Sequence, residues 1–199
     1  MKKPTLTIMC GIPRCGKSSW IRKNKGDACI VSPDEIRKEM FGHQFHGPAN
    51  RFVFGIAEGM TTLLLKQGKD VIIDATNITV ASRSAWRGIA NVENAEVRVV
   101  WVRACKDDMA NFRACLERNE LSEEGKKLPM DALLRMATFF ESPDPKFESW
   151  YTLIKVFNPH QRRLPPEKRI NIDAGDSMLQ LIQKGEKLWD VAAKKEPDS

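Results

Sequence analysis

The chain has 199 residues, which fits one α/β domain of ordinary size and leaves too little for a second full domain. Hydrophobic residues make up 42% of the composition and charged residues 29%, which excludes a disordered or fibrous protein. No apolar stretch approaches the roughly 20 residues that cross a bilayer, so we expect no membrane contact. The formal charge of +6 favours an anionic partner such as nucleic acid, although many basic proteins bind none.

The start of the chain and the cysteine pattern indicate a cytoplasmic protein. The first apolar run ends at Cys10 and leads into a glycine loop instead of a cleavage site, so we interpret it as a strand and not as an export signal. The cysteines form no C-x-x-C pair and no metal-type pairing with histidine. We expect reduced thiols at Cys10, Cys15, Cys29, Cys105 and Cys115.

Short apolar strands alternate with helices along the chain. The predicted strands lie at residues 5–10, 28–31, 71–74, 97–102 and 152–157, with a short one at 169–172. The predicted helices lie at residues 17–23, after Ser32, and at 50–66, 80–92, 107–119, 130–140 and 176–194. This alternation predicts a three-layer α/β fold, in which a parallel sheet has helices on both faces. We expect one domain over residues 1–195, a helical lid at about 118–130, and a frayed tail at 196–199.

The predicted helix at residues 50–66 has the clearest helical periodicity. Its apolar residues recur at three- and four-residue spacing, which indicates one buried face. That face comprises Val53, Ile56, Ala57, Met60, Leu63 and Leu64. We also expect residues 152–157 to form the last core strand.

A phosphate-binding loop (P-loop) follows the first strand. Residues 11–18 match the pattern G-x-x-x-x-G-K-[ST] at every fixed position, between a predicted strand and a predicted helix. Backbone N–H groups of such a loop surround the phosphates, the lysine reaches the β- and γ-phosphate oxygens, and the serine hydroxyl ligates Mg²⁺. We therefore expect ATP and Mg²⁺ as cofactors. The nucleotide would contact Gly11, Ile12, Pro13, Arg14, Cys15, Gly16, Lys17, Ser18 and Ser19.

Two acidic residues follow predicted strands, where parallel sheets place ligand-binding groups. Asp74 is the candidate to hold Mg²⁺ together with Ser18; the alternative is that it caps the following helix. Asp34 and Arg37 lie three residues apart on one helical face. Asp34 could accept a proton from an acceptor hydroxyl while Arg37 binds an acceptor phosphate. The two residues could equally form a surface ion pair.

These motifs together resemble the 5′-kinase domain of phage polynucleotide kinases. In chain order they are Gly16-Lys17-Ser18, Ser32 to Arg37, Asp74-Ala75-Thr76-Asn77, Arg83, Arg118-Asn119 and Leu128-Pro129. The resemblance runs from about residue 5 to about residue 140. Zeta-toxin-like and other small-molecule kinases belong to the same P-loop kinase branch.

The resemblance implies a role for several residues. Asp34 would be the general base for a 5′-hydroxyl, and Arg37 would contact the acceptor's 3′-phosphate. Arg118 would be a lid arginine that acts with Lys17 on the donor phosphates. Thr76, Asn77 and Arg83 would contact the substrate. Lys126 or Lys127 would contact ATP in place of the family's second lid arginine. Ala75 departs from the family's D-x-N or D-T-N pattern, and lysine is a point charge where arginine forms a fork.

The implied activity is transfer of the γ-phosphate of ATP to a 5′-hydroxyl end of DNA or RNA, as in nucleic acid repair. A phage could encode such a protein, which would then act in the host cytoplasm. A small-molecule kinase for a nucleoside, sugar or antibiotic hydroxyl is the alternative. A third alternative, a nucleotide-dependent regulatory module without kinase activity, is disfavoured because it gives no role to Asp34 and Arg37. The basic stretch 155–169 could bind the phosphates of a nucleic acid, or it could be a solvated surface loop. Bases could stack on Phe41, His43, Phe45 and His46, which could instead pack in a core or a loop.

Overall fold

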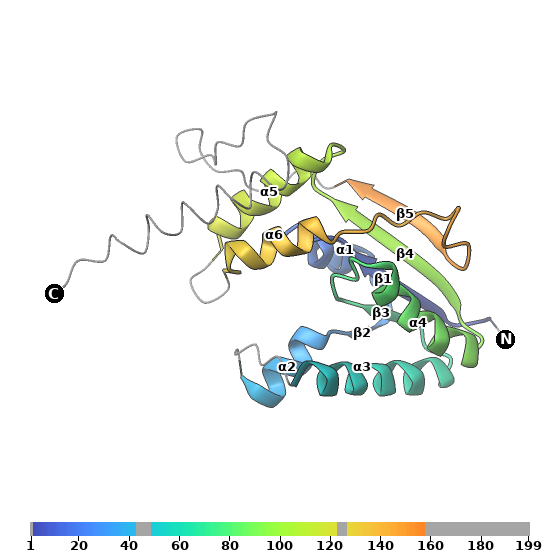
Figure 1. The fold of residues 1–199 in the computed structure, drawn as a ribbon. Coiled ribbons are helices and arrows are strands. Elements are labelled where there is room, and N and C mark those ends of the chain that lie inside the picture. Colours follow the sequence, from blue (N-terminus) through green and yellow to red (C-terminus); the bar gives the residue numbers. More distant parts are fainter. Residues whose placement is uncertain (1, 43–48, 123–126, 158–199) are drawn as a thin grey trace, which may run out of the picture.

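The computed structural model describes residues 2–42, 49–122 and 127–157, which form a parallel sheet between two layers of helices (Figure 1). The strand order is β2-β3-β1-β4-β5, and every neighbouring pair is parallel. The strands are β1 (Thr5–Cys10), β2 (Cys29–Val31), β3 (Val71–Ile73), β4 (Glu96–Arg103) and β5 (Thr152–Phe157). The helices are α1 (Lys17–Asn24), α2 (Pro33–Phe41), α3 (Ala49–Lys66), α4 (Val80–Val92), α5 (Asp108–Glu120) and α6 (Met130–Thr138). The predicted three-layer α/β architecture is confirmed.

Central strand β1 is apolar on both faces because helices cover both sides of the sheet. Its alternate residues Leu6 and Ile8 belong to one buried cluster, together with Trp86 of α4. Met9 points to the opposite face, where it joins the cluster that contains Phe112 of α5 and Leu133 of α6. The carboxyl ends of the strands therefore meet at one edge of a rigid layer, which is where the phosphate-binding loop begins.

The buried face of α3 differs from the predicted one. Val53 and Ala57 are buried as expected, but the stripe continues through Thr61 and Leu65. Thr61 can be buried because its hydroxyl donates to the Ala57 carbonyl of the same helix at 2.7 Å. The prediction was wrong for two residues: Met60 and Leu63 are 43% and 57% exposed.

Strand β5 has the predicted bounds but is not a core strand. It lies at the edge of the sheet and pairs only with β4, so its side chains are half-buried or exposed. The strand predicted at 169–172, the helix predicted at 176–194 and the tail 196–199 lie outside the described residues. The five cysteines are free thiols. None of the helices in the described ranges combines the length and apolar character of a bilayer span.

Candidate nucleotide-binding and phosphoryl-transfer site

The phosphate-binding loop connects the carboxyl end of β1 to the first turn of α1. Gly11 has φ 145° and lies so close to β4 that an added Cβ would meet the Val102 carbonyl oxygen at 2.6 Å and the Cys15 sulfur at 2.7 Å. Gly16, with φ 113°, precedes α1 as its N-cap. Only glycine fits these two backbone positions without strain. The N-terminus of α1 and the loop amides thereby form an anion-binding site.

Lys17 is buried with its ammonium group inside this loop. Its Nζ donates to the carbonyl oxygens of Gly11 at 2.8 Å and Ile12 at 3.1 Å. A lysine ammonium carries three donors, so these two bonds orient the group and leave a direction for a phosphate oxygen.

Arg118, in the last turn of α5, reaches back onto the phosphate-binding loop. Its Nη1 donates to the carbonyl oxygen of Arg14 at 3.1 Å and to that of Cys15 at 3.4 Å. These residues border a cavity of about 390 Å³, which is lined by Arg14, Gly16, Lys17, Ser18, Ser19, Arg118, Leu121 and Ser122. Three of the lining residues are cationic and none of them is acidic, so the cavity attracts a polyanion such as a triphosphate.

The base of the predicted lid is held together by Asn119. Its Nδ2 donates to the Leu128 carbonyl at 2.8 Å, and its Oδ1 accepts from the Leu128 backbone N–H at 3.0 Å. These two bonds close the chain between α5 and α6. Lys127 forms a surface ion pair with Glu120 at 3.5 Å, whereas Lys126 lies outside the described residues.

Asp74 stands directly after β3, beside Lys17. Burial raises the pKa of its carboxyl group, the charge of Lys17 acts to lower it, and the charges of Asp34 and Glu35 act to raise it. These interactions place Asp74, Lys17 and Asp34 within electrostatic range of one another. The helix-cap alternative is wrong, because Thr79 caps α4.

The oxygen groups of Ser18 and Asp74 fit Mg²⁺, which prefers hard oxygen ligands and usually takes one or two from the protein beside phosphate oxygens and water. Ser18 is exposed at the start of α1, and the half-buried carboxylate of Asp74 lies within electrostatic range of Lys17. Among the described residues, no cluster of three or more acidic, histidine or cysteine side chains forms an all-protein metal site.

Asp34 and Arg37 form an ion pair on α2, with 2.5 Å between Oδ1 and Nη1. Ser32 caps this helix by accepting from the Glu35 backbone N–H at 3.3 Å, which presents Asp34 in the first turn. The guanidinium also donates from Nη2 to Oδ1 of Asn50 at 2.8 Å. Asn50, at the start of α3, was not singled out in the sequence because no local pattern links it to Arg37.

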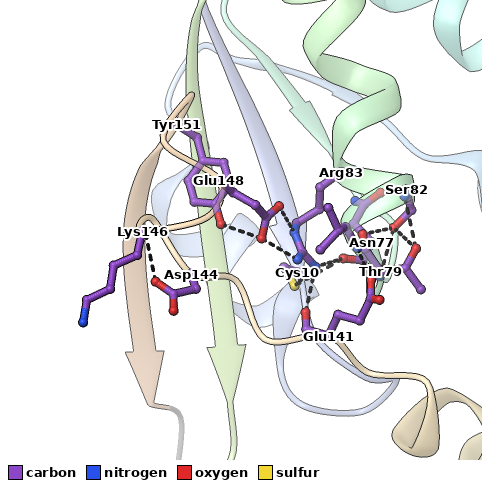
Figure 2. A network of polar contacts seen from close by, with 11 residues as sticks. Cys10, Asn77, Thr79, Ser82, Arg83, Glu141, Asp144, Lys146, Glu148 and Tyr151 are labelled. Atoms are coloured by element: carbon purple, nitrogen blue, oxygen red, sulfur yellow. Dashed lines mark hydrogen bonds and ion pairs between the residues drawn. The ribbon is translucent and has the colours of Figure 1, made fainter.

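The prediction that Asn77 and Arg83 contact the substrate was wrong, because both side chains belong to a buried polar network (Figure 2). Arg83 is fully buried and Asn77 is 4% exposed, so neither side chain offers a surface to a substrate. Asn77 instead joins β1 to α4: its Nδ2 donates to the Met9 carbonyl at 2.8 Å, and its Oδ1 accepts from Trp86 at 3.1 Å. Thr76 is half-buried, and its carbonyl accepts from the Gly11 N–H at 2.9 Å.

The hypothetical nucleic acid path is only partly described. Phe41 is 43% exposed at the end of α2, and Lys155 lies with its ammonium 5.4 Å from the ring centre of Trp101. His43, Phe45, His46 and the basic residues Arg162, Arg163, Lys168 and Arg169 lie outside the described residues.

Comparison with known proteins identifies the family. The family described as AAA domain (AAA_33) matches residues 6–143, and no curated protein matches the chain. The Pnkp1/Rnl/Hen1 RNA repair complex contains a chain with a similar structure, with a TM-score of 0.59 and 22% identity over 87% of this chain and 53% of that one. This chain therefore spans about half the length of that protein.

Two further similar structures match over nearly their whole length. Kti12 from Chaetomium thermophilum, in complex with ADP-AlF3, has a TM-score of 0.53 and 16% identity over 93% of this chain and 97% of that one. A sugar kinase from Janibacter sp. HTCC2649 has a TM-score of 0.51 and 12% identity over 99% and 100%. The chain belongs to the AAA domain family AAA_33 and has the fold of the P-loop kinases.

Proposed function

We propose that this protein is an ATP-dependent polynucleotide kinase that transfers the γ-phosphate to a 5′-hydroxyl end of DNA or RNA. The carrying observation is the Asp34–Arg37 pair, whose carboxylate is 85% exposed at the same edge of the sheet as the phosphate-binding loop. Asp34 is electrostatically coupled to Asp74, which is coupled to Lys17. An exposed carboxylate beside a phosphate donor site is what deprotonation of an acceptor hydroxyl requires.

The proposed transfer divides the work among four groups. The loop amides and Lys17 hold the β- and γ-phosphates, and Arg118 neutralises the charge that develops on the transferred phosphoryl group. Asp34 takes the proton from the acceptor oxygen as that oxygen forms its bond to the γ-phosphorus and the bond to the ADP oxygen breaks. Magnesium held through Ser18 and Asp74 would supply charge neutralisation on the β- and γ-phosphate oxygens.

The choice of a nucleic acid acceptor rests on two supports. The formal charge of +6 favours a polyanionic substrate. The similar chain in an RNA repair complex shares the fold that presents Asp34 and the loop. Arg37 would contact a phosphate on the acceptor strand beside the reacting hydroxyl, as the resemblance of the sequence to the polynucleotide kinases implies.

A small-molecule kinase is the second candidate. It is supported by the Janibacter sugar kinase, whose fold is similar over 99% of this chain. The same Lys17, Arg118 and Asp34 would serve this reaction, so only the acceptor distinguishes the two candidates.

The test is transfer of labelled γ-phosphate from ATP with Mg²⁺ to a panel of acceptors. The panel holds 5′-hydroxyl DNA and RNA oligonucleotides, nucleoside 3′-monophosphates, nucleosides and sugars. Asp34→Asn is the loss-of-base variant, and Glu39→Gln, an exposed acid on the same helix, is its matched control. Labelled oligonucleotides with wild type and Glu39→Gln but not with Asp34→Asn would support the proposal. Labelling of nucleosides or sugars alone would replace it with the second candidate.

A further inference from the structure

Arg83 and Glu148 form a buried ion pair, and Figure 2 shows the pair with its polar partners. Neither residue lines the nucleotide cavity. Nε and Nη2 of Arg83 donate to the two carboxylate oxygens of Glu148 at 2.9 and 2.7 Å. The Tyr151 hydroxyl donates to the same carboxylate at 3.1 Å. Burial acts to raise the pKa of Glu148, but the bonds and charge of Arg83 outweigh it and lower the pKa. Both members of the pair are therefore charged and fully paired.

Such a pair is weak evidence for stability alone, because removing two charges from water costs about as much as their attraction returns. The third nitrogen of the guanidinium indicates what the pair does. Nη1 of Arg83 donates to the carbonyl oxygens of Asn77 at 3.2 Å and Glu141 at 2.9 Å. One buried group thus fixes two backbone segments that are far apart in the sequence.

The first segment leads directly to the phosphate-binding loop. Asn77 has a left-handed backbone, with φ 42°, and its carbonyl also accepts from the Cys10 thiol at 3.3 Å. Burial raises the pKa of Cys10 to about 12, so the thiol keeps the proton that it donates. The next carbonyl upstream, that of Thr76, accepts from Gly11. The carbonyl that Arg83 holds is therefore only one residue away from the carbonyl that anchors the start of the loop.

The second segment follows the lid. Glu141 lies just beyond α6, and its backbone N–H donates to the Ile78 carbonyl at 2.8 Å. Its carboxylate accepts from the Val80 N–H at 2.5 Å, at the first turn of α4. The chain that returns from the lid is thereby fastened to the same strand-end segment that carries Asp74.

We propose that Arg83, held in place by Glu148, is a positioning residue that sets the Asn77 peptide and so fixes Asp74 relative to the phosphate-binding loop and to the return of the lid. The effect on turnover rests on the proposed function. The effect on the loop does not rest on it, because the Gly11–Thr76 hydrogen bond does not depend on any phosphoryl-acceptor substrate. Arg83 and Glu148 are 0% and 5% exposed and do not line the cavity, so the proposed role is positioning and not catalysis.

The central experiment replaces the pair with apolar residues in the double variant Arg83→Met/Glu148→Leu. This change keeps the side-chain volume and removes both buried charges, so we expect a folded protein. Its unfolding temperature should be lower than that of wild type, because the carbonyls of Asn77 and Glu141 lose a donor. We expect hydrogen exchange at the Gly11 amide, measured by NMR, to be at least about tenfold faster than in wild type. The reason is that the Thr76 carbonyl, which accepts from this amide, loses the support of Arg83. We expect kcat to fall by about 10²-fold, because small displacements of catalytic groups have effects of that size.

Three further variants separate positioning from general destabilisation. Tyr151→Phe removes one hydrogen bond to Glu148 and leaves Arg83 bridged, so Gly11 exchange and kcat should stay near wild type. Leu65→Ala opens a cavity in α3, away from the loop, and should lower the unfolding temperature without selectively exposing Gly11. Arg83→Lys keeps the charge but cannot reach Glu148 and both carbonyls at once, so we expect the same defects in Gly11 exchange and kcat. This variant serves as the test if the double variant does not fold.

The two proposals fail in different ways. Gly11 exchange at the wild-type rate in the folded double variant, or in Arg83→Lys, would overturn the positioning role. Faster Gly11 exchange with weaker ADP binding by calorimetry would support it. Wild-type protein that labels no oligonucleotide would refute the polynucleotide kinase assignment, and the exchange and ADP measurements would still decide the role of Arg83.

Discussion

Nη1 of Arg37 lies 2.5 Å from Oδ1 of Asp34, in a pair whose guanidinium side is 12% exposed and whose carboxylate side is 85% exposed. Asn50 holds the guanidinium from the other side at 2.8 Å. An exposed i,i+3 pair contributes little to stability. This pair is asymmetric, because a half-buried, anchored arginine holds an accessible carboxylate. The proposed role of Asp34 as a general base requires such an orientation.

Arg37→Gln should therefore lower kcat for the preferred acceptor by about 10²-fold, since general-base catalysis contributes about 10²–10⁴-fold and depends on orientation. ADP affinity should stay within about twofold, because α2 does not line the nucleotide cavity. Steady-state kinetics and calorimetry measure the two effects. Lys38→Gln, the adjacent exposed cation, is the matched control. An unchanged kcat with a raised acceptor KM would show instead that Arg37 only binds the acceptor.

Arg118 should matter more for transfer than for binding. It is anchored to the loop carbonyls of Arg14 and Cys15. A cationic group that stabilises the transferred phosphoryl group contributes about 10³–10⁵-fold in other P-loop enzymes. We expect Arg118→Ala to lower kcat by about 10³-fold, and Arg118→Lys to recover only part of the loss because lysine lacks the planar fork.

Lys127→Ala is the comparison for Arg118, because Lys127 belongs to the same predicted lid but pairs with Glu120 on the surface. We expect less than about a tenfold decrease in kcat from this variant. A decrease as large as that of Arg118→Ala would mean that Lys127 closes onto the phosphates and serves as the second lid cation.

The sequence alone was enough to predict the groups whose signals are local. The phosphate-binding loop, the parallel strands and the acid after β3 each follow from a few neighbouring residues. The cap of α2 is similarly local, because Ser32 bonds the backbone N–H only three residues on. Such features were predicted with nearly correct bounds.

The groups that the sequence did not identify depend on contacts between distant residues. Glu148, which explains the burial of Arg83, is 65 residues away from it in the chain and has no motif of its own. The roles of Arg83 and Asn77 were therefore misassigned to the substrate. On α3, the apolar pattern did not identify the buried stripe, because that stripe passes through the polar residue Thr61.

Asp74 should show opposite effects on stability and on activity. Its pKa is raised in the folded protein, mainly by burial, so the folded state holds the proton more tightly than the unfolded chain does. This contribution favours folding below the unfolded-state pKa of about 3.9 and is lost as pH rises through the higher folded-state pKa. At neutral pH the charged carboxylate therefore destabilises the fold.

Asp74→Asn should raise the unfolding temperature at neutral pH, because it removes the charge that burial penalises, while it abolishes Mg²⁺-dependent transfer. The gain should disappear in acid, below the folded-state pKa. Thermal unfolding in EDTA across the pH range measures this effect without bound metal. Asp131→Asn, on the surface of α6, is the control and should show no such trend. A less stable Asp74→Asn at neutral pH would contradict the raised pKa.

Gly11 and Gly26 allow a test of the loop that separates backbone strain from steric exclusion. Both have a positive φ, at 145° and 51°, but a Cβ on Gly26 meets nothing within 4 Å, whereas one on Gly11 meets Val102 and Cys15. Gly26→Ala should lower the free energy of unfolding by about 1 kcal/mol, which is the cost of the left-handed backbone. ATP binding should be unaffected.

Gly11→Ala should be worse in both respects, because the added methyl group must displace β4 or the loop. We expect an additional destabilisation of about 1–3 kcal/mol, which is typical of overpacking. ATP affinity should fall at least about tenfold, since the amides and the carbonyl that orient Lys17 shift together. Chemical denaturation and ATP titration of the two variants measure these effects. Equal ATP affinity in Gly11→Ala and Gly26→Ala would show that contact with β4 does not determine the shape of the phosphate site.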